Sequence, residues 1–341
     1  MKLIAGIDDL SLDNRTFDVS REEIQRICRF FSMGELDHFE KEKGTVISHS
    51  NHFVYAATDQ GQFALKFYPA KAARSIMMEY AQNRFLRARH FQTALMYAGH
   101  QGQASVPSNG RCASCYSFID GVPVWKRINQ LNTIQQVNAS LLSLKEILSS
   151  GKDRIPCQEQ ESLPKTINTL IKISRQNSPY DQETMINASL KDAFQSYQQH
   201  QRSFKRQRLH NNANLTNFLI QKNKAYCLDL SHIREDYDLA DLASLIISCL
   251  FFEIASSTIK KITDNYFTQD KTGPKDLLVL NTLIKAGLIR EYLKNIQREN
   301  SVEFASPAPG LRKIYLSQLA KRKRTISDEL KKNKDNRKFM L

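Results

Sequence analysis

The spacing of apolar and polar residues predicts a sheet-rich first part of the chain. Ser20 and Glu23 have the spacing of a capping box, and apolar residues follow at helical intervals, so we predict a short amphipathic helix there. Residues 44–68 contain three runs of β-branched and aromatic residues, and the turn at residues 59–61 joins the last two. This pattern predicts a hairpin within a small antiparallel sheet.

The rest of the chain has mostly helical spacing. A helix is expected at residues 71–90, and a strand at 113–119 follows a loop at 100–110. The predicted helices beyond residue 121 span residues 129–150, 160–176, 182–200, 237–261, 274–297 and 310–334, with polar linkers at 150–165 and 262–273. The pattern therefore predicts an α+β protein with a small antiparallel-sheet N-terminal lobe and a larger, mainly helical C-terminal lobe.

A polar, asparagine-rich segment interrupts the predicted helices. The segment spans residues 209–230 and begins with a polar loop that ends at Asn217. Two short apolar runs, 218–220 and 225–230, then flank a turn at residues 222–224. We therefore expect a loop that leads into a small hairpin in the middle of the helical region.

The order of these elements predicts three parts of the chain. We expect an N-terminal lobe with a leading helix and a sheet at residues 1–121, and a helical C-terminal lobe with the loop and hairpin at residues 122–310. Residues 311–341 would form a basic C-terminal helix or tail. A cleft between two lobes is a favoured place for a ligand.

The charge of the chain is strongly positive and unevenly distributed. The 341 residues include 49 basic and 35 acidic ones, which gives a formal net charge of +14. Residues 321–338 hold nine basic and three acidic residues. A solvated terminal helix explains this segment, and contact with an anionic partner, such as a protein or a membrane surface, is the alternative. The segment lacks the interleaved aromatic residues of single-strand binders, so we do not expect a nucleic acid partner.

Cysteine usage and hydropathy indicate a cytoplasmic protein. The six cysteines are scattered, which favours a reducing compartment over a disulfide framework. The longest apolar stretch, residues 242–252, is far shorter than the ~20 residues of a membrane span, so no transmembrane segment is expected. Cys112 and Cys115 have the CxxC spacing, but they fall on a predicted strand without a second pair nearby, so packed thiols are favoured over a zinc or redox site.

Two residues of the first lobe could bind nucleotide phosphates. Lys66 lies between the apolar residues Leu65 and Phe67, so alternation along the strand can turn its ammonium group toward the cleft, where it could contact phosphate oxygens. Glu79, in the next predicted helix, could hold the lysine by an ion pair. An exposed strand lysine and a solvated glutamate are the alternative interpretations.

Two residues at the ends of the predicted hairpin could bind a magnesium ion. Mg²⁺ prefers hard oxygen ligands and takes one or two protein side chains together with phosphates. Asn217 precedes the hairpin and Asp229 follows it, so the hairpin could bring both side chains to one ion. Asp241, twelve residues later, begins an apolar helix, and we expect it to cap that helix or to brace the loop.

The loop and the segments after it resemble a known family. In the superfamily of aminoglycoside phosphotransferases, choline kinases and type II homoserine kinases, the catalytic loop has the pattern His-Gly-Asp-x-x-x-x-Asn. His210, Asn212 and Asn217 have the spacing of its His, Asp and Asn. Asp229 resembles the metal-binding aspartate of the family, and Asp241 resembles its Asp-Leu-Ala element.

The first lobe resembles the same superfamily, in the same order along the chain. Asn51 precedes a strand that carries Lys66, Glu79 follows in a helix, and residues 118–121 stand where the family has its hinge. The resemblance covers residues 20–300 approximately. Each motif is short, but five of them in order are hard to obtain by chance.

The resemblance implies a protein-kinase-like fold that binds ATP and Mg²⁺ between its lobes and transfers the γ-phosphoryl group to a hydroxyl of a small molecule. The residues that it assigns to the nucleotide are Asn51, Lys66, Glu79 and Ile119, those that it assigns to the metal are Asn217 and Asp229, and those that it assigns to catalysis are His210 and Asn212.

The loop departs from the family at its catalytic position. Asn212 stands where the family has an aspartate that accepts the proton of the attacking hydroxyl, and Asn211 stands where the family has a glycine. An amide is a poor base, and the loss of a general base costs about 10²–10⁴ in rate. We therefore expect an impaired kinase or, as the alternative, a pseudokinase that acts as a binding or scaffold protein. Asp236 or Glu235 could serve as a substitute base.

The approach to the loop is basic. Lys205, Arg206 and Arg208 crowd this segment. A solvated helix end explains them, and attraction of an anionic substrate is the alternative. Such a neighbourhood argues against a cationic aminoglycoside as the acceptor.

Overall fold

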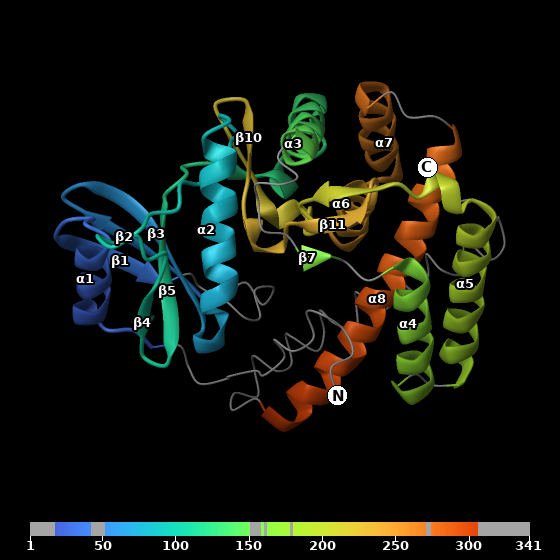
Figure 1. Cartoon of the computed structure of the whole chain (residues 1–341), viewed down its shortest axis with the longest axis horizontal. Coiled ribbons are helices and arrows are strands. Elements are labelled where there is room, and N and C mark those ends of the chain that lie inside the picture. Colours follow the sequence, from blue (N-terminus) through green and yellow to red (C-terminus); the bar gives the residue numbers. More distant parts are fainter. Residues whose placement is uncertain are drawn as a thin grey trace.

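The computed structural model describes residues 18–41, 52–150, 158–159, 162–177, 180–270 and 274–305. An antiparallel sheet with two helices forms the N-terminal part, and helices dominate the C-terminal part (Figure 1). Three predicted features lie outside the described residues: the strand-like run at 45–50, Asn51, and the basic tail with its helix at 310–334.

A five-stranded sheet, antiparallel throughout, forms the N-terminal part. Its strands, in spatial order, are β1 (Leu36–Lys41), β2 (His52–Thr58), β3 (Gly61–Pro69), β5 (Arg111–Ser117) and β4 (Val106–Ser108). The predicted hairpin is present as β2 and β3. The sequence did not predict β1 or β4, because β1 has its apolar residues at helical spacing and β4 is short and contains a proline.

Two helices cover opposite faces of this sheet. α1 (Arg21–Phe30) begins at Ser20, whose side chain accepts a hydrogen bond from Glu23 N, and packs on the face that carries the odd-numbered residues of β3. α2 (Ala73–Arg87) packs on the other face through Ile76. This second face is turned toward the C-terminal part, and α2 lies at the boundary (Figure 1).

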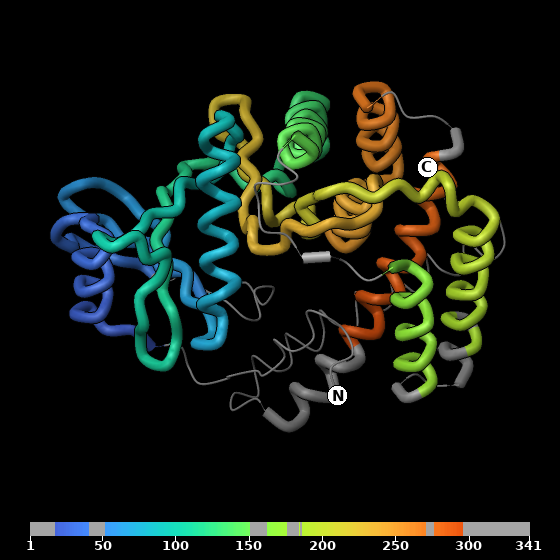
Figure 2. The backbone as a smooth tube through the Cα atoms, in the orientation of Figure 1, coloured from blue at the N-terminus to red at the C-terminus, as the bar shows by residue number. Residues whose placement is uncertain are grey.

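The described helices of the C-terminal part surround one hydrophobic core. They are α3 (Leu131–Ser150), α4 (Leu163–Asn177), α5 (Tyr180–Gln199), α6 (Ala240–Phe251), α7 (Ser256–Asp270) and α8 (Pro274–Ala305). The long helix α8 contacts α4, α5 and α6, and in Figure 2 its coloured part runs along the side of α4 and α5 that is nearer the sheet. None of the described helices is long and apolar enough to cross a membrane.

Two small sheets position the segments between these helices. The first contains β6 (Val122–Pro123) and the predicted hairpin, β9 (Phe218–Gln221) and β10 (Lys224–Cys227). The second contains β7 (Gln158–Glu159), β11 (Arg234–Tyr237) and β8 (Arg206–Leu209). Because β6 directly follows the N-terminal sheet and pairs with β9, the connection between the two parts is attached to the hairpin.

The single helix predicted at residues 237–261 is wrong. The chain forms β11, then α6 and α7, with a break between the helices at Glu253, whose φ is 55°. Ile254 N donates to Cys249 O at 3.0 Å, which closes the end of α6. Helix α7 therefore occupies most of the predicted linker at 262–273. No glycine or proline marks the break, so the apolar spacing gave no sign of it.

The basic approach to the loop is a strand rather than a helix end. Arg206 and Arg208 lie in β8, which pairs antiparallel with β11. Arg206 Nη2 donates to Glu235 O at 3.2 Å, and its guanidinium lies over the ring of Tyr237. These arginines thus have contacts within the small sheet.

Candidate active site

Strand β3 turns Lys66 toward the C-terminal part of the chain. Its neighbours Leu65 and Phe67 are buried against α1. Because side chains alternate along a strand, Lys66 and Tyr68 project from the opposite face, on which α2 packs. Lys66 is only 3% exposed, and a buried ammonium group requires an anionic partner because its desolvation is costly.

Lys66 pairs with two carboxylates, one from each part of the chain. Its Nζ lies 2.7 Å from Asp229 Oδ1 and 3.7 Å from Glu79 Oε2. Burial would lower the pKa of Lys66, but the two carboxylates raise that pKa above its usual value. The ion pair expected between Lys66 and Glu79 is therefore present, and Asp229 is the closer partner.

Two tyrosines that the sequence analysis did not single out hold Glu79. Tyr68 Oη lies 2.8 Å from Glu79 Oε2, Tyr116 Oη lies 3.0 Å from Oε1, and the two hydroxyl oxygens lie 2.6 Å apart. The two hydroxyls have two protons for the three contacts, and Glu79 is the other group of the three that can carry a third proton. Burial raises the pKa of Glu79, while the charge of Lys66 opposes that shift.

Four side chains contact Asp229, whose own φ is 56°. Besides Lys66, Ser231 Oγ donates to Oδ1 at 2.9 Å, Asn212 Nδ2 donates to Oδ2 at 3.1 Å, and His232 Nε2 lies 3.6 Å from Oδ2. Burial would raise the pKa of Asp229, but the charge of Lys66, with a smaller effect of His232, holds the pKa well below its usual value of 3.8. Asp229 is therefore ionised at neutral pH.

Asp241 braces the start of the asparagine-rich loop. Its Oδ2 accepts a hydrogen bond from His210 N at 2.8 Å, and its Oδ1 accepts one from Asn211 N at 2.7 Å. Asn211 has a φ of 61°, a left-handed conformation that asparagine adopts more readily than most residues. The chain thus keeps a glycine-like backbone where the resembled family has glycine.

His210 lies inside the structure. Its side chain is fully buried, and Nε2 lies 2.9 Å from Leu228 O. The ring thereby connects the loop to the residue before Asp229. A catalytic role for His210 stays a prediction, and these contacts suit a residue that positions the loop.

The asparagine side chains connect the rest of the loop to Asp229. While Asn212 Nδ2 donates to Asp229, Asn212 Oδ1 accepts a hydrogen bond from Asn214 Nδ2 at 2.8 Å. Asn217 Nδ2 donates to Asn212 O at 2.8 Å, and Leu228 N donates to Asn217 O at 2.8 Å. The two predicted metal ligands, Asn217 and Asp229, are therefore both in contact with Asn212.

The donor atoms at this place suit a hard divalent cation. Asp229 offers carboxylate oxygens, and Asn217 offers an amide oxygen that accepts no hydrogen bond from the described residues. Mg²⁺ uses such oxygens together with nucleotide phosphates. In the part of the chain that the structure describes, no three or more His, Cys, Asp and Glu side chains form a cluster that could hold a metal by themselves.

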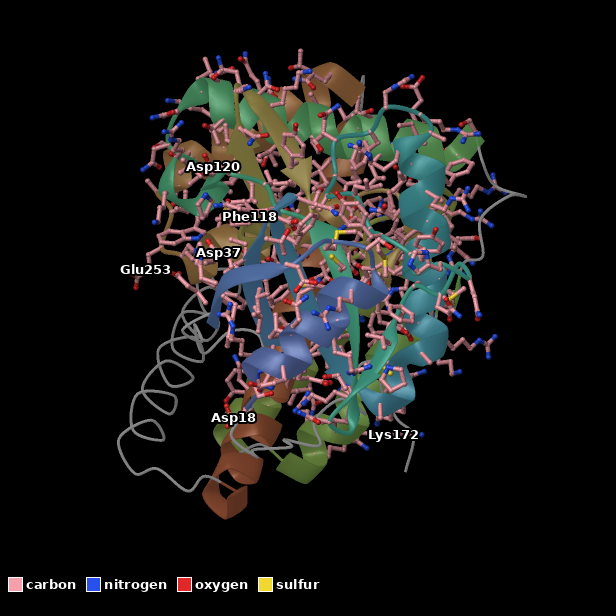
Figure 3. The ribbon with its side chains drawn as sticks, turned by 90° about the vertical axis from the view of Figure 1, so that its left-hand side faces the viewer. Asp18, Asp37, Phe118, Asp120, Lys172 and Glu253 are labelled. Atoms are coloured by element: carbon pink, nitrogen blue, oxygen red, sulfur yellow. The ribbon has the colours of Figure 1, made fainter. Side chains whose placement is uncertain are left out.

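The connection between the two parts carries Ile119, whose contact with a nucleotide stays a prediction. Residues 118–121 run from β5 to β6, and Ile119 packs on the cluster at the α2 face of the sheet. Gly121 N donates to Ile119 O at 2.8 Å. Phe118 and Asp120, on either side of Ile119, are exposed, as Figure 3 shows.

The CxxC pair lies on strand β5 and cannot act as one site. Cys115 is buried on the α1 face of the sheet, and Cys112 is buried on the α2 face. Residues three apart on a strand point to opposite faces, so the two thiols are separated by the sheet itself. Burial raises the pKa of both thiols. They are packed thiols, as the sequence favoured.

The fold and these contacts define a protein of the protein-kinase-like class. The model of the phosphotransferase enzyme family matches residues 43–274, and the chain belongs to that family. No curated protein sequence matches the chain.

Solved structures of small-molecule kinases share the fold over nearly the whole chain. An amicoumacin kinase, in complex with AMP-PNP, Ca²⁺ and Ami, is similar with a TM-score of 0.61 and 14% identity, over 91% of this chain and 94% of that one. An aminoglycoside phosphotransferase from Alicyclobacillus acidocaldarius is similar with a TM-score of 0.63 and 10% identity, over 95% and 98%. A choline kinase from Cryptosporidium parvum is similar with a TM-score of 0.62 and 15% identity, over 94% and 98%. The predicted fold class and the resemblance to aminoglycoside phosphotransferases and choline kinases are thus confirmed.

Proposed function

We propose that this protein is a kinase that transfers the γ-phosphoryl group of ATP, bound with Mg²⁺, to a hydroxyl of a small molecule. The observation that carries the proposal is the convergence of Lys66, Glu79, Asp229 and Asn212 in one contact network across the boundary between the two parts. Membership of the phosphotransferase family and the fold shared with small-molecule kinases support the same reaction. The similar amicoumacin kinase, seen with AMP-PNP and Ca²⁺, supports the use of a nucleotide and a divalent cation.

Each residue of the network has a task in this proposal. Lys66 would contact the phosphates of ATP as a fixed positive charge, and Glu79 would keep it in place. Asp229 and Asn217 would hold Mg²⁺, which neutralises phosphate charge when it is bound. Asn51 and Ile119 are the further residues proposed for nucleotide contact.

Asn212 is proposed to stand at the acceptor hydroxyl. Its amide oxygen can accept a hydrogen bond and orient the hydroxyl, but it cannot take the proton as a carboxylate would. Phosphoryl transfer depends mainly on positioning and charge stabilisation, so a slow reaction remains compatible with asparagine. We therefore infer a native rate about 10²–10⁴ below that of an otherwise equal enzyme with a base.

Two measurements test this proposal. Thermal unfolding with and without MgATP reports on the nucleotide site, and we expect a rise in Tm at millimolar nucleotide; a Tm that does not move would contradict the proposal. ADP release by the wild type and by Asn212→Asp, measured with a panel of small alcohols, reports on the chemistry. We expect the variant to be faster by at least a factor of ten with a true acceptor, and Asn214→Asp serves as a matched control in the same loop.

The second candidate function is a pseudokinase that binds nucleotide without efficient transfer. It is favoured by the contacts of Asn212, whose amide nitrogen donates to Asp229 while its oxygen accepts from Asn214. Only an amide can make both contacts, since a carboxylate has no hydrogen to donate to Asp229. A nucleotide-dependent rise in Tm with no ADP release by either the wild type or Asn212→Asp would favour this function.

A further inference from the structure

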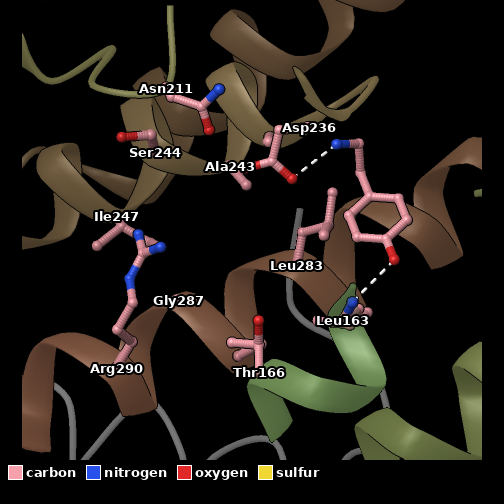
Figure 4. A pocket seen from close by; sticks show the side chains of 13 residues that line it. Leu163, Thr166, Asn211, Asp236, Ala243, Ser244, Ile247, Leu283, Gly287 and Arg290 are labelled. Atoms are coloured by element: carbon pink, nitrogen blue, oxygen red, sulfur yellow. Dashed lines mark hydrogen bonds between the residues drawn. The ribbon is translucent and has the colours of Figure 1, made fainter. Parts of the chain in front are cut away.

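A pocket of about 70 Å³ lies beside the asparagine-rich loop (Figure 4). Elements β11, α4, α6 and α8 line it, and Asn211 of the loop forms part of its wall. Asn211 is the residue before Asn212 in the chain, so the pocket and the position proposed to face the attacking hydroxyl share the same loop. Asp236 and Arg290 are the only charged residues among its described lining. Of the two carboxylates considered as substitute bases, Asp236 lines the pocket and Glu235 does not.

Asp236 presents a carboxylate oxygen without a protein partner. Its Oδ1 accepts a hydrogen bond from Tyr237 N at 2.7 Å, but its Oδ2 accepts none from the described residues. Leu163 N donates to Tyr237 Oη at 2.8 Å, which fixes this end of β11 to α4, as Figure 4 shows. Burial raises the pKa of Asp236, although the charges of Arg234 and Arg290 oppose that shift.

Arg290 reaches the pocket from α8 and is also poorly paired. Its Nε is buried and makes no hydrogen bond. The carboxylate near it, Glu291 Oε1, lies 3.8 Å away and already pairs with Lys294 Nζ at 3.0 Å. No ion pair joins Arg290 to Asp236 among the described residues, and Figure 4 shows the two side chains entering from different elements. Asp236 is 8% exposed and the side chain of Arg290 is 30% exposed, so a ligand that pairs with both would add charge-assisted hydrogen bonds to two groups with few protein partners.

One part of the wall is apolar and another part carries hydroxyl groups. The apolar part is formed by Ala243, Ile247, Leu283, Ala286 and Gly287, and Thr166 and Ser244 supply the hydroxyl groups. A Cβ atom on Gly287 would lie 2.5 Å from Ile247 Cδ1, so the glycine allows α6 and α8 to approach closely along this wall. The volume corresponds to about five to seven water-sized groups, which limits the occupant to a compact molecule.

We propose that this pocket binds the acceptor as a compact zwitterion, whose ammonium group pairs with Asp236 and whose acid group pairs with Arg290. That the zwitterion is the acceptor of the phosphoryl group rests on the proposed function. That the pocket binds a zwitterion rests on the pocket alone. A molecule with only a cationic group would make no pair with Arg290, and a molecule with only an acid group would make no pair with Asp236. A guanidinium pairs with carboxylate and with phosphate, so either group meets the requirement.

Calorimetric titration of the full-length protein, without nucleotide, tests the pocket. The probes are L-serine and L-homoserine for a zwitterion with a carboxylate, phosphoethanolamine for one with a phosphate, choline for a cation alone and glycerate for an anion alone. We expect at least one zwitterion to bind at least ten times more tightly than choline and glycerate. Whether the zwitterions with a carboxylate or the one with a phosphate bind more tightly identifies the acid group that the pocket prefers. Choline or glycerate binding as tightly as every zwitterion, or no binding of any zwitterion, would overturn the proposal.

Three variants connect the binding to the named residues. Arg290→Gln should lower the affinity for the zwitterion at least tenfold and leave the affinity for choline unchanged. Asp236→Asn should lower the affinity for the zwitterion and leave the affinity for glycerate unchanged. Ala286→Leu places a larger apolar side chain in the pocket without a change in charge, so it should lower the affinity for every probe. Circular dichroism establishes that each variant is folded. If Arg290→Gln and Asp236→Asn are folded and bind the zwitterion like the wild type, the proposal is wrong.

The outcome for the pocket is separate from the outcome for the kinase reaction. MgATP binding, followed by Tm, and ADP release are measured on the same protein with and without the zwitterion. A zwitterion that binds through Asp236 and Arg290 but never stimulates ADP release, even in Asn212→Asp, would support the pocket and contradict the proposed function. A MgATP-dependent rise in Tm without zwitterion binding would support the nucleotide site of the proposed kinase and contradict the proposal for the pocket.

Discussion

Lys66 and Asp229 lie 163 residues apart in the sequence, and their side chains meet at 2.7 Å. One comes from the N-terminal sheet and the other from the segment after the C-terminal hairpin, so this ion pair joins the two parts. Both residues are also proposed to act on the bound nucleotide, Lys66 on phosphates and Asp229 on the metal. A nucleotide with its metal would therefore compete with the ion pair and replace it with contacts to itself.

The first prediction concerns the lysine of this pair. Lys66→Met removes the buried charge and keeps most of the side-chain volume, which leaves the half-buried Asp229 without its closest cation. We expect a loss of about 3–5 kcal/mol in the free energy of unfolding, since that is the usual cost of breaking a buried ion pair. We also expect the MgATP-dependent rise in Tm to disappear. Lys224→Met, at an exposed hairpin position, is the control, and equal losses in both variants would contradict the prediction.

The second prediction concerns the pH dependence of stability. Because the pKa of Asp229 is lower in the folded protein than its usual value of 3.8, its contribution to stability is complete above that value. The contribution is lost as the pH falls from 3.8 through the lower pKa of the folded state. The difference in the free energy of unfolding between the wild type and Asp229→Asn, measured with urea from pH 7 to pH 3, reports this contribution. The wild type should be the more stable by a constant margin above about pH 5, and the margin should shrink below pH 4. A margin that is the same at pH 7 and pH 3 would contradict this assignment.

The third prediction follows from the contacts of Glu79 with Tyr68 and Tyr116. If Glu79 carries the third proton, Glu79→Gln can make the same three contacts, because an amide both donates and accepts. We expect this variant to change the free energy of unfolding by less than about 1 kcal/mol. Glu79→Ala should cost about 1–3 kcal/mol more, since it leaves the two hydroxyls short of a partner. Infrared difference spectra of the wild type against Glu79→Gln should contain the carbonyl band of a protonated acid, and its absence would show an ionised Glu79.

The sequence predicted the part of this site that depends on local alternation. Leu65 and Phe67 had to face the core, so Lys66 faced the other way, and the same argument would have found Tyr68. The loop and Asp241 could be predicted because their spacing is short and fixed. Tyr116 could not, because it reaches Glu79 through the register of β5 against β3, which pairs it with Ala64.

In the fold as well, the elements set by local sequence could be predicted and those set by distant contacts could not. The hairpins and most helices follow from the period of apolar residues. The break at Glu253 does not follow from it, because the apolar run of α6 continues up to this residue. The backbone of Glu253 is left-handed, but no glycine in the sequence indicates that conformation. Strand β11, with the sequence REDY, has three charged residues, and its pairing with β8 and β7, which local spacing does not reveal, makes it a strand.

The fourth prediction concerns the backbone of Asn211. Both Asn211→Gly and Asn211→Ala lose the hydrogen bond from Nδ2 to Arg234 O, so a comparison of the two isolates the left-handed conformation. Alanine avoids this conformation and glycine does not, and we expect the alanine variant to be the less stable by about 1 kcal/mol. Chemical denaturation measures the difference. Equal stability, or a more stable alanine variant, would show that the loop does not hold this conformation.

The fifth prediction concerns the response of stability to Mg²⁺. Asn212→Asp removes the hydrogen bond from Nδ2 to Asp229 and places a second carboxylate beside it, so the two negative charges repel each other. Without divalent cations we expect the variant to unfold at a lower Tm than the wild type. Millimolar Mg²⁺ should recover most of the loss, because a cation that binds only the folded state stabilises it. Asn212→Ala removes the same hydrogen bond without adding charge, and its Tm should respond to Mg²⁺ no more than that of the wild type. If Mg²⁺ raises the Tm of all three proteins equally, the position of Asn212 beside Asp229 has no part in cation binding.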